Sequence, residues 1–163
     1  MKRLMIVLWV ALALGSQAVA FAQARPDFSG SWRLNVGKSA PNVAGNTPII
    51  PFPSQITVKQ TPTDIAIEST SVRQQPVAAV YKLDGSKVSV QTPAGITETG
   101  EAKFEGENLS ISSRRSFSSP AGDIVVEFRE VWSLTGNVLT IQKTRTQSGD
   151  STTEKSQAVY DKL

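Results

Sequence analysis

The chain has 163 residues, with 17 lysines and arginines against 14 aspartates and glutamates, and it contains neither histidine nor cysteine. Without these two residue types the chain lacks the commonest general base, the thiolate nucleophile, disulfides and the usual ligands of transition metals. Composition therefore argues against most enzyme mechanisms, and we expect neither catalysis nor a metal or other cofactor.

The N-terminal segment, residues 1–24, is typical of a cleavable secretory signal. Two cations precede an apolar run at residues 4–14, and small residues with A-x-A spacing end at Ala20 and Ala24. A membrane anchor is the competing interpretation, but the run is shorter than the roughly 20 apolar residues that span a bilayer. The sequence predicts a bacterial protein that is secreted or periplasmic after cleavage at one of the two sites and has no membrane span.

Residues 25–163 then have the size of a single domain that can bury its own core. Removing the two cations of the signal leaves 15 basic against 14 acidic residues. This balance gives no reason to expect a nucleic-acid partner, and the composition leaves the oligomeric state open.

Apolar residues alternate with polar ones along most of this domain, and short breaks rich in Gly, Asn, Asp or Pro separate the alternating runs. Such a pattern predicts an all-β protein. The predicted strands lie near residues 28–36, 55–60, 64–70, 77–83, 87–92, 96–104, 108–117, 123–134, 138–147 and 151–161. Short connections predict an antiparallel up-and-down meander of about 8–10 strands, closed into a barrel because closure removes exposed edges. A β-sandwich is the alternative.

Turn positions also predict the register of three hairpins, because residues that face each other across a hairpin must lie on the same face. The turns are Pro62-Thr63, Asp84-Gly85 and Gly136-Asn137, and in all three the apolar faces agree. The predicted pairs are Val58 with Ile67, Ala79 with Val90, Tyr81 with Val88, Phe128 with Arg145, Glu130 with Lys143, Trp132 with Ile141 and Leu134 with Leu139.

The segment from Ser39 to Ser54 is the exception to the short connections, because it contains four prolines and no usable strand pattern. Loops of this length in compact domains are usually functional or disordered. Ile49, Ile50 and Phe52 argue against a solvated tail. The segment is either a loop packed against the barrel wall or a lid over the barrel mouth.

The first strand places Gly30 and Trp32 on the same face, so that Trp32 points inward and Gly30 leaves room for another backbone or ring. Such an arrangement suits the closed end of a small barrel. The same residues are also compatible with an ordinary core tryptophan beside a bulge glycine.

Gly30-Ser31-Trp32 resembles the G-x-W motif of lipocalins, and residues 27–39 are similar to the start of small secreted bacterial lipocalin-like proteins. Residues 131–134, residues 139–141 and the final Val159-Tyr160 add weaker similarity. The resemblance implies a calycin-type barrel, closed at the G-x-W end, with the segment 39–54 across the open end. It also implies that a basic side chain of a late strand packs on Trp32; Arg145 is the matching position, and Lys143 is the second choice.

Charged residues on inward faces predict a site inside the barrel. Arg115 and Glu130 fall in the inward phase of their strands, and a buried charge needs a partner. Lys143 is the predicted partner of Glu130, which leaves Arg115 and Arg145 without an assigned anion. The two arginines could receive the acidic head of a ligand whose apolar part lies against Phe104, Phe128 and Trp132, or they could reach water near the barrel ends.

The remaining acidic residues give little reason to expect catalysis. Glu98, Glu101, Glu105 and Glu107 alternate or lie at turns, as a solvated face would. The first hypothesis is therefore a non-catalytic binding protein for a hydrophobic or amphipathic small molecule. The second is a structural or protein-interaction module whose barrel is filled by its own side chains, and a carboxylate-dependent hydrolase ranks last.

Overall fold

The computed structural model describes residues 25–40, 43–44, 47–48, 52–71, 76–91, 97–120, 122–150 and 152–163. Within these residues ten antiparallel strands form one sheet. The strands are β1 Gly30–Leu34, β4 Gln55–Gln60, β5 Asp64–Thr70, β6 Val77–Lys82, β7 Val88–Gln91, β8 Thr97–Glu105, β9 Asn108–Ser119, β10 Gly122–Thr135, β11 Val138–Gln147 and β12 Glu154–Lys162. The ten predicted strands are thus confirmed to within a few residues at each end.

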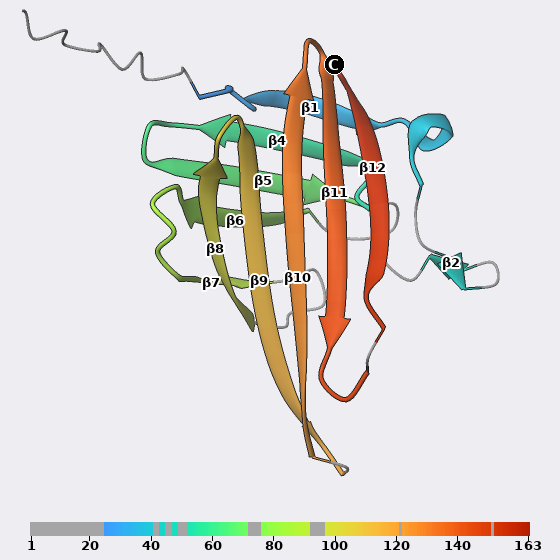
Figure 1. The fold of residues 1–163 in the computed structure, drawn as a ribbon. Helices are drawn as coiled ribbons and strands as arrows, with labels where there is room; N and C mark the ends of the chain where they lie inside the picture. The colour runs from blue at the N-terminus through green and yellow to red at the C-terminus, as the bar shows by residue number, and fades with distance from the viewer. Residues whose placement is uncertain are drawn as a thin grey trace, which may run out of the picture.

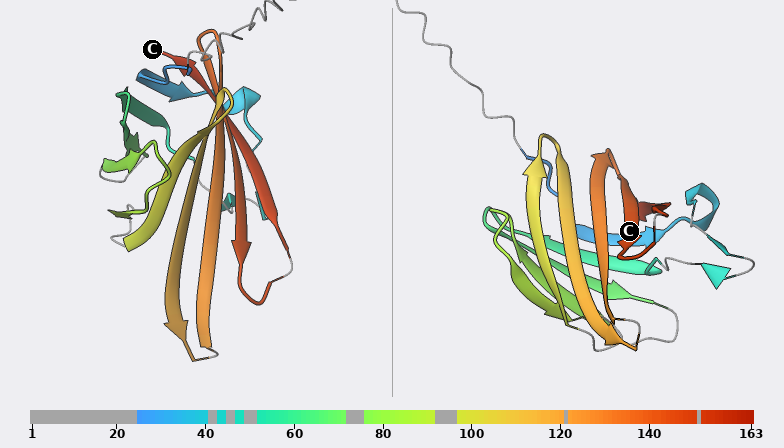
Figure 2. Two further views of the ribbon diagram at one scale, coloured as in Figure 1. Left: turned by 60° about the vertical axis from the view of Figure 1, so that its left-hand side comes forward. Right: turned by 60° about the horizontal axis from the view of Figure 1, so that its bottom comes forward.

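The sheet follows the order β6-β5-β4-β1-β12-β11-β10-β9-β8-β7 and curves into a nearly closed barrel (Figure 1). β1 lies between β4 and β12, so that the first and last strands of the sheet in sequence are neighbours. Figure 2 shows β9 and β10 reaching past their neighbours at the end of the barrel opposite β1. The predicted barrel is confirmed in preference to the sandwich.

The barrel has one seam, between β6 and β7, which end the strand order and are not paired with each other. The predicted pairs Tyr81 with Val88 and Ala79 with Val90 are therefore wrong. The alternation of apolar residues that suggested them is real, because Tyr81 and Val90 are both buried. The alternation specified the inward face and not the partner strand.

The chain leaves β6 for a different partner at the Asp84-Gly85 segment. Asp84 forms an isolated bridge with Lys103 of β8, and the Gly85 amide donates to the Ala102 carbonyl at 3.0 Å. These contacts carry the chain across the seam, so that β7 adds to β8 and does not fold back on β6.

The other predicted registers are confirmed. Val58 lies opposite Ile67 across β4 and β5. All four predicted pairs of the Gly136-Asn137 hairpin are present between β10 and β11. Local turns and alternating faces were sufficient here because each of these hairpins connects strands that are adjacent both in sequence and in the sheet.

A hydrophobic core fills one end of the barrel and takes residues from all ten strands of the sheet. Its members are Phe28, Trp32, Ile56, Val58, Ile65, Ile67, Tyr81, Leu83, Val90, Ala102, Leu109, Ile111, Trp132, Leu139, Ile141, Ala158 and Tyr160. Trp32 is fully buried, and its indole nitrogen donates to the Phe28 carbonyl at 3.0 Å. We call this region the apolar end.

The residue that packs on Trp32 comes from β12. Lys162 lies opposite Trp32 in register, and its ammonium nitrogen is 5.2 Å from the centroid of the indole ring. A Cβ at Gly30 would lie 2.9 Å from Lys162 Cε, so the glycine makes room for this side chain. The assignment of Arg145 or Lys143 to Trp32 is therefore wrong.

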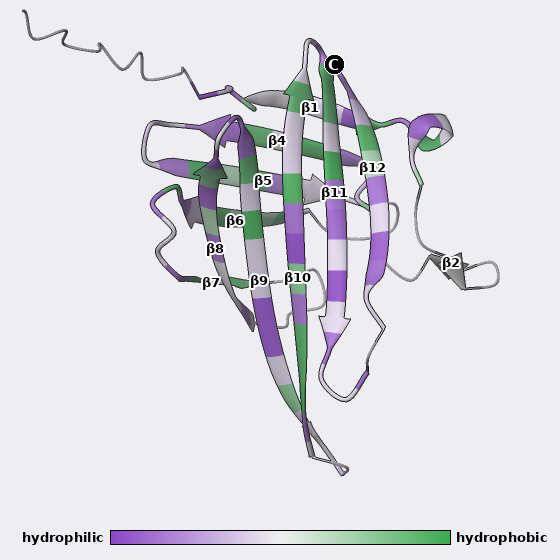
Figure 3. Ribbon diagram, viewed as in Figure 1, coloured by the Kyte–Doolittle hydropathy of each residue, from purple (hydrophilic) through white to green (hydrophobic). Residues whose placement is uncertain are grey.

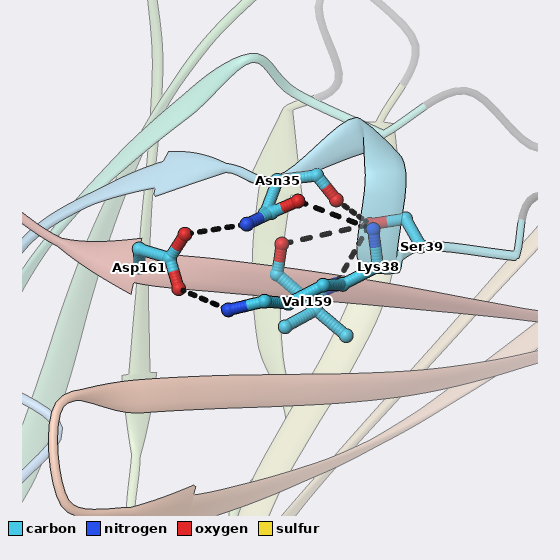
Figure 4. Close-up of polar contacts among 5 residues, drawn as sticks. All are labelled: Asn35, Lys38, Ser39, Val159 and Asp161. Atoms are coloured by element: carbon cyan, nitrogen blue, oxygen red, sulfur yellow. Dashed lines mark hydrogen bonds and ion pairs between the residues drawn. The ribbon is translucent and has the colours of Figure 1, made fainter.

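A short 3₁₀-helix, η1 (Val36–Lys38), is tied to β12 by polar contacts (Figure 4). Asn35 Nδ2 donates to Asp161 Oδ2 at 2.6 Å, and Lys38 forms an ion pair with the same carboxylate at 3.3 Å. The Val159 amide donates to Ser39 Oγ at 2.9 Å, and Ser39 Oγ donates to the Asn35 carbonyl at 2.7 Å. These bonds fix the point at which the proline-rich segment leaves the barrel.

The proline-rich segment contains two short strands that the sequence did not predict, β2 (Val43–Ala44) and β3 (Thr47–Pro48), which pair with each other. Phe52 is partly buried against the apolar end. Ile49 and Ile50 lie outside the described residues, as does the signal at residues 1–24. The lid remains a prediction.

Candidate functional site

Beyond the apolar end, the same strand faces carry charged side chains. On β9, Arg115 lies on the same face as the core residues Leu109 and Ile111, and on β10, Glu130 lies on the same face as Trp132. The inward faces that form the core therefore carry charged side chains farther along these strands. We define the ionic belt as six residues of β8 to β12: Glu98, Arg115, Glu130, Lys143, Arg145 and Glu154. Figure 3 shows the change along β11 and β12, whose lower parts are more hydrophilic than their upper parts.

Glu130 and Lys143, which the sequence pairs, lie directly opposite each other and form an ion pair of 2.7 Å. Trp132 Nε1 also donates to Glu130 Oε2 at 2.9 Å. Burial raises the pKa of Glu130, but the charge of Lys143 and hydrogen bonds from Lys143 and Trp132 outweigh it and leave the pKa below its ordinary value. Glu130 is therefore held as a carboxylate, where the apolar end meets the ionic belt.

Arg145 is not an unpaired cation, in contrast to the expectation from the sequence. It lies opposite Glu154 in register, and the two side chains form an ion pair of 3.1 Å. The amide oxygen of Gln147 accepts a second hydrogen bond from the guanidinium. The sequence missed Glu154 because the connection between β11 and β12 is too long and irregular for hairpin arithmetic.

Arg115 is also paired, with Glu98 at 3.2 Å. Glu98 is only 7% exposed, so its assignment to a solvated face is wrong. A sequence signal for this pair exists. A two-residue turn at Gly106-Glu107 places Phe104 opposite Leu109, as observed, and the same register continued along the strands brings Glu98 opposite Arg115.

Phe128 provides an aromatic surface within the ionic belt. Arg115 Cζ and Lys143 Nζ each lie 5.2 Å from the centroid of its ring. Rings in such positions attract cations through their electron-rich faces. Phe128 thus helps to hold two of the belt's three cations in place.

Phe104 and Trp132 belong to the apolar end and not to the ionic belt. Trp132 packs edge-on against Phe28 with centroids 6.1 Å apart, and Phe104 packs on the same ring at 6.3 Å. Arg25 covers Phe104 from outside at 5.0 Å. Of the five residues predicted to bind a ligand, Arg115, Arg145 and Phe128 thus lie in the belt region, whereas these two lie at the other end.

Three buried polar atoms of this region have no hydrogen-bond partner within the described part of the chain: Arg115 Nε, Glu154 Oε2 and Ser156 Oγ. Ser156 is 7% exposed and lies opposite Lys143. Its phase with Ala158 and Tyr160 could have indicated an inward hydroxyl from the sequence. Buried polar groups in proteins are nearly always hydrogen-bonded, either to protein groups or to ordered water, so each of these atoms offers a hydrogen bond to a water molecule or to a polar group of a ligand.

Tyr81 of β6 reaches across the seam to β8. A Cβ at Gly100 would lie 2.6 Å from Tyr81 Cε1, so the ring occupies the space that a side chain at Gly100 would need. Burial and the neighbouring carboxylates of Glu130 and Glu98 raise the pKa of Tyr81. The phenol therefore stays neutral where the ionic belt meets the seam.

The apolar end has a hollow of about 230 Å³, lined by Arg25, Asp27, Gln60, Thr61, Pro62, Leu83 and Phe104.

Among the described residues, no group of three or more acidic side chains is placed to hold a metal ion. No helix in the described part of the chain is long and apolar enough to cross a membrane.

Solved structures match this architecture. The zebrafish ileal bile acid-binding protein, in complex with cholic acid, matches with a TM-score of 0.60 and 16% identity, covering 83% of this chain and 98% of that one. The REP1-NXSQ fatty acid transporter matches with a TM-score of 0.53 and 9% identity, covering 83% and 95%. A fatty acid-binding protein from the brain of Drosophila melanogaster matches with a TM-score of 0.51 and 15% identity, covering 83% and 99%.

The chain therefore has a calycin-type fold, an all-β meander in a nearly closed barrel. No protein-family model matches the sequence, and no curated protein is significantly similar to it. The shared feature is the barrel, and the residues inside it must indicate what this particular chain does.

Proposed function

We propose that this protein is a non-catalytic binding protein for a hydrophobic or amphipathic small molecule, exported by its N-terminal signal to the periplasm or the medium of a bacterium. The observation that carries the proposal is the ionic belt. Its charged side chains face the barrel interior beyond the apolar end, and three buried polar atoms near them have no hydrogen-bond partner among the described residues.

A barrel that served only as a structural module would be more stable with apolar filling, because buried ion pairs rarely repay the cost of removing charges from water. In this chain the apolar end already supplies a core with residues from all ten strands. The belt is therefore better explained by recognition of a ligand than by stability. The solved structures of similar fold are, by their names, proteins that bind or transport fatty acids and bile acids, which agrees with this proposal.

The belt carboxylates do not favour a hydrolase. Glu98, Glu130 and Glu154 are each held in an ion pair with a cation of a neighbouring strand. A carboxylate-dependent glycosidase instead needs two acidic groups that flank the substrate, one of them with a raised pKa. The pKa of Glu130 is shifted in the opposite direction.

The test is native mass spectrometry of the mature protein purified gently from its own source, followed by denaturing extraction of anything released. A small molecule at stoichiometric amount supports the proposal and identifies its class. The same preparation, stripped of ligand, is then titrated with a neutral fluorescent probe, N-phenyl-1-naphthylamine. An apo mass together with no probe uptake would contradict the proposal and favour an interaction module with a filled barrel.

A further inference from the structure

The charges of the ionic belt are balanced. Its three cations and three carboxylates are matched one to one, in ion pairs of 3.2, 2.7 and 3.1 Å. Each of these side chains is at most 25% exposed. A ligand that carried a free carboxylate would therefore bring an extra negative charge to cations that the protein already neutralises. The unpartnered donor of the belt, Arg115 Nε, can equally be satisfied by the oxygen of a neutral hydroxyl.

The unpartnered atoms on β12 have a definite chemistry. Glu154 Oε1 accepts from Arg145, whereas Glu154 Oε2 is buried and accepts from no described residue. An ionised carboxylate oxygen can only accept a hydrogen bond, so its partner must be a donor. A fatty-acid anion has no donor at its head and would be repelled by this oxygen.

Ser156 Oγ lies on the same inner face, two residues along β12 from Glu154. The two Cα atoms are thus separated by about 7 Å along the strand. A hydroxyl group can both donate and accept, and so can Ser156 Oγ. A head that bears neighbouring hydroxyls could donate to Glu154 Oε2 while it exchanges a hydrogen bond with Ser156 Oγ.

We propose that the ionic belt receives the hydroxyl-bearing head of a neutral amphiphile, such as a long-chain monoacylglycerol, and that Glu154 Oε2 and Ser156 Oγ of β12 bind this head. The inference rests on the proposed function and deepens it. It replaces the acidic head that the sequence suggested for Arg115 and Arg145, because both arginines are paired within the protein.

The test compares two ligands with the same acyl chain, 1-monooleoylglycerol and oleate, by displacement of N-phenyl-1-naphthylamine from the mature protein at neutral pH. We expect the dissociation constant of monooleoylglycerol to be at least about tenfold lower, the scale of one hydrogen bond to a charged group. Equal or tighter binding of oleate would overturn the head-group inference and leave the proposed function in place. If neither ligand nor probe bound, the proposed function itself would fail.

Matched variants separate hydrogen bonding from net charge. Glu154→Gln and Glu98→Gln both add one positive charge to the belt, so both should strengthen oleate binding. Only Glu154→Gln removes the unpartnered acceptor, and it should weaken monooleoylglycerol binding at least about fivefold more than Glu98→Gln does. Equal effects of the two variants would mean that Glu154 Oε2 does not bind the head.

Ser156→Ala provides a second variant that conserves charge and nearly conserves size. It should weaken monooleoylglycerol binding about three- to tenfold and change oleate binding less, since one neutral hydrogen bond is lost. An unchanged affinity for monooleoylglycerol would remove Ser156 from the proposed site. Thermal melting of each variant in the absence of ligand shows that it is folded.

Discussion

The two ends of the barrel interior have opposite chemistry, although the strands β8 to β12 contribute to both. On β10 the inward residues change from Trp132 to Glu130 within one step of the alternation, and on β11 they change from Ile141 to Lys143. The apolar end is closed by packing and by Lys162 on Trp32. The difference teaches that the inward phase of a strand specifies where a side chain points, while the residue type decides whether the position contributes stability or recognition.

The two ends should also contribute differently to folding. Burial of large apolar side chains is strongly favourable, whereas an ion pair in a half-buried position repays little more than the cost of desolvating its charges. Removing one member of such a pair nevertheless destabilises the folded protein, because the other charge stays partly buried without a partner. Mutations at the two ends therefore test this comparison directly.

The largest effect is expected at the apolar end. Trp32→Ala removes a fully buried indole and its hydrogen bond to Phe28, and should lower the free energy of unfolding by about 3–5 kcal/mol. Urea denaturation followed by circular dichroism measures the change. Val36→Ala, at a position that is 73% exposed, is the control and should stay within about 0.5 kcal/mol of the native protein. A near-neutral Trp32→Ala would show that the indole does not close the barrel.

In the ionic belt, Glu130→Gln should lower the free energy of unfolding by about 2–3 kcal/mol at neutral pH. It leaves Lys143, whose side chain is 20% exposed, without its anion. Glu105→Gln is the control, because the ion pairs of Glu105 with Lys103 and Arg129 are exposed and should contribute less than about 1 kcal/mol. Equal losses in the two variants would mean that the belt is effectively solvated.

Gly100→Ala should disturb the boundary between the two ends. The added Cβ would lie 2.6 Å from Tyr81 Cε1, so the ring that bridges the seam must move. We expect the free energy of unfolding to fall by about 1–2 kcal/mol. Gly37→Ala is the matched control, because the nearest atom to its Cβ would be Asn35 Oδ1 at 3.6 Å, an ordinary contact. Near-ultraviolet circular dichroism should report the displaced tyrosine, and an unchanged spectrum and stability would argue against this packing.

The smallest expected effect is a dependence on pH. The pKa of Glu130 in the folded protein lies below its value in the unfolded chain, so its contribution is fully present above the unfolded value, about pH 4.3. It is lost as the pH falls through the lower, folded value. As the pH falls below about 4.3, Glu130→Gln should therefore lose less stability than the native protein does. Urea denaturation at a series of pH values measures both proteins. Equal losses of unfolding free energy in the two proteins on acidification would contradict the lowered pKa.

Much of the fold was predictable because it depends on neighbours in sequence. Alternation gave the ten strands, and two-residue turns gave the register of the hairpins at Pro62-Thr63 and Gly136-Asn137. The same reasoning paired Glu130 with Lys143. The Asp84-Gly85 hairpin was wrong because a turn signal cannot tell whether the next strand returns to its predecessor or crosses to β8.

The amino-acid sequence by itself determined that the chain is all-β and which side chains point inward, because a period of two is a local property of a strand. Only the tertiary structure decided which groups Lys162 and Arg145 meet. Lys162 reaches Trp32 because the last strand, β12, pairs with the first strand, β1, and Arg145 meets Glu154 across a connection longer than a two-residue turn. These contacts depend on the alignment of strands that no two-residue turn connects, and no local pattern encodes that alignment.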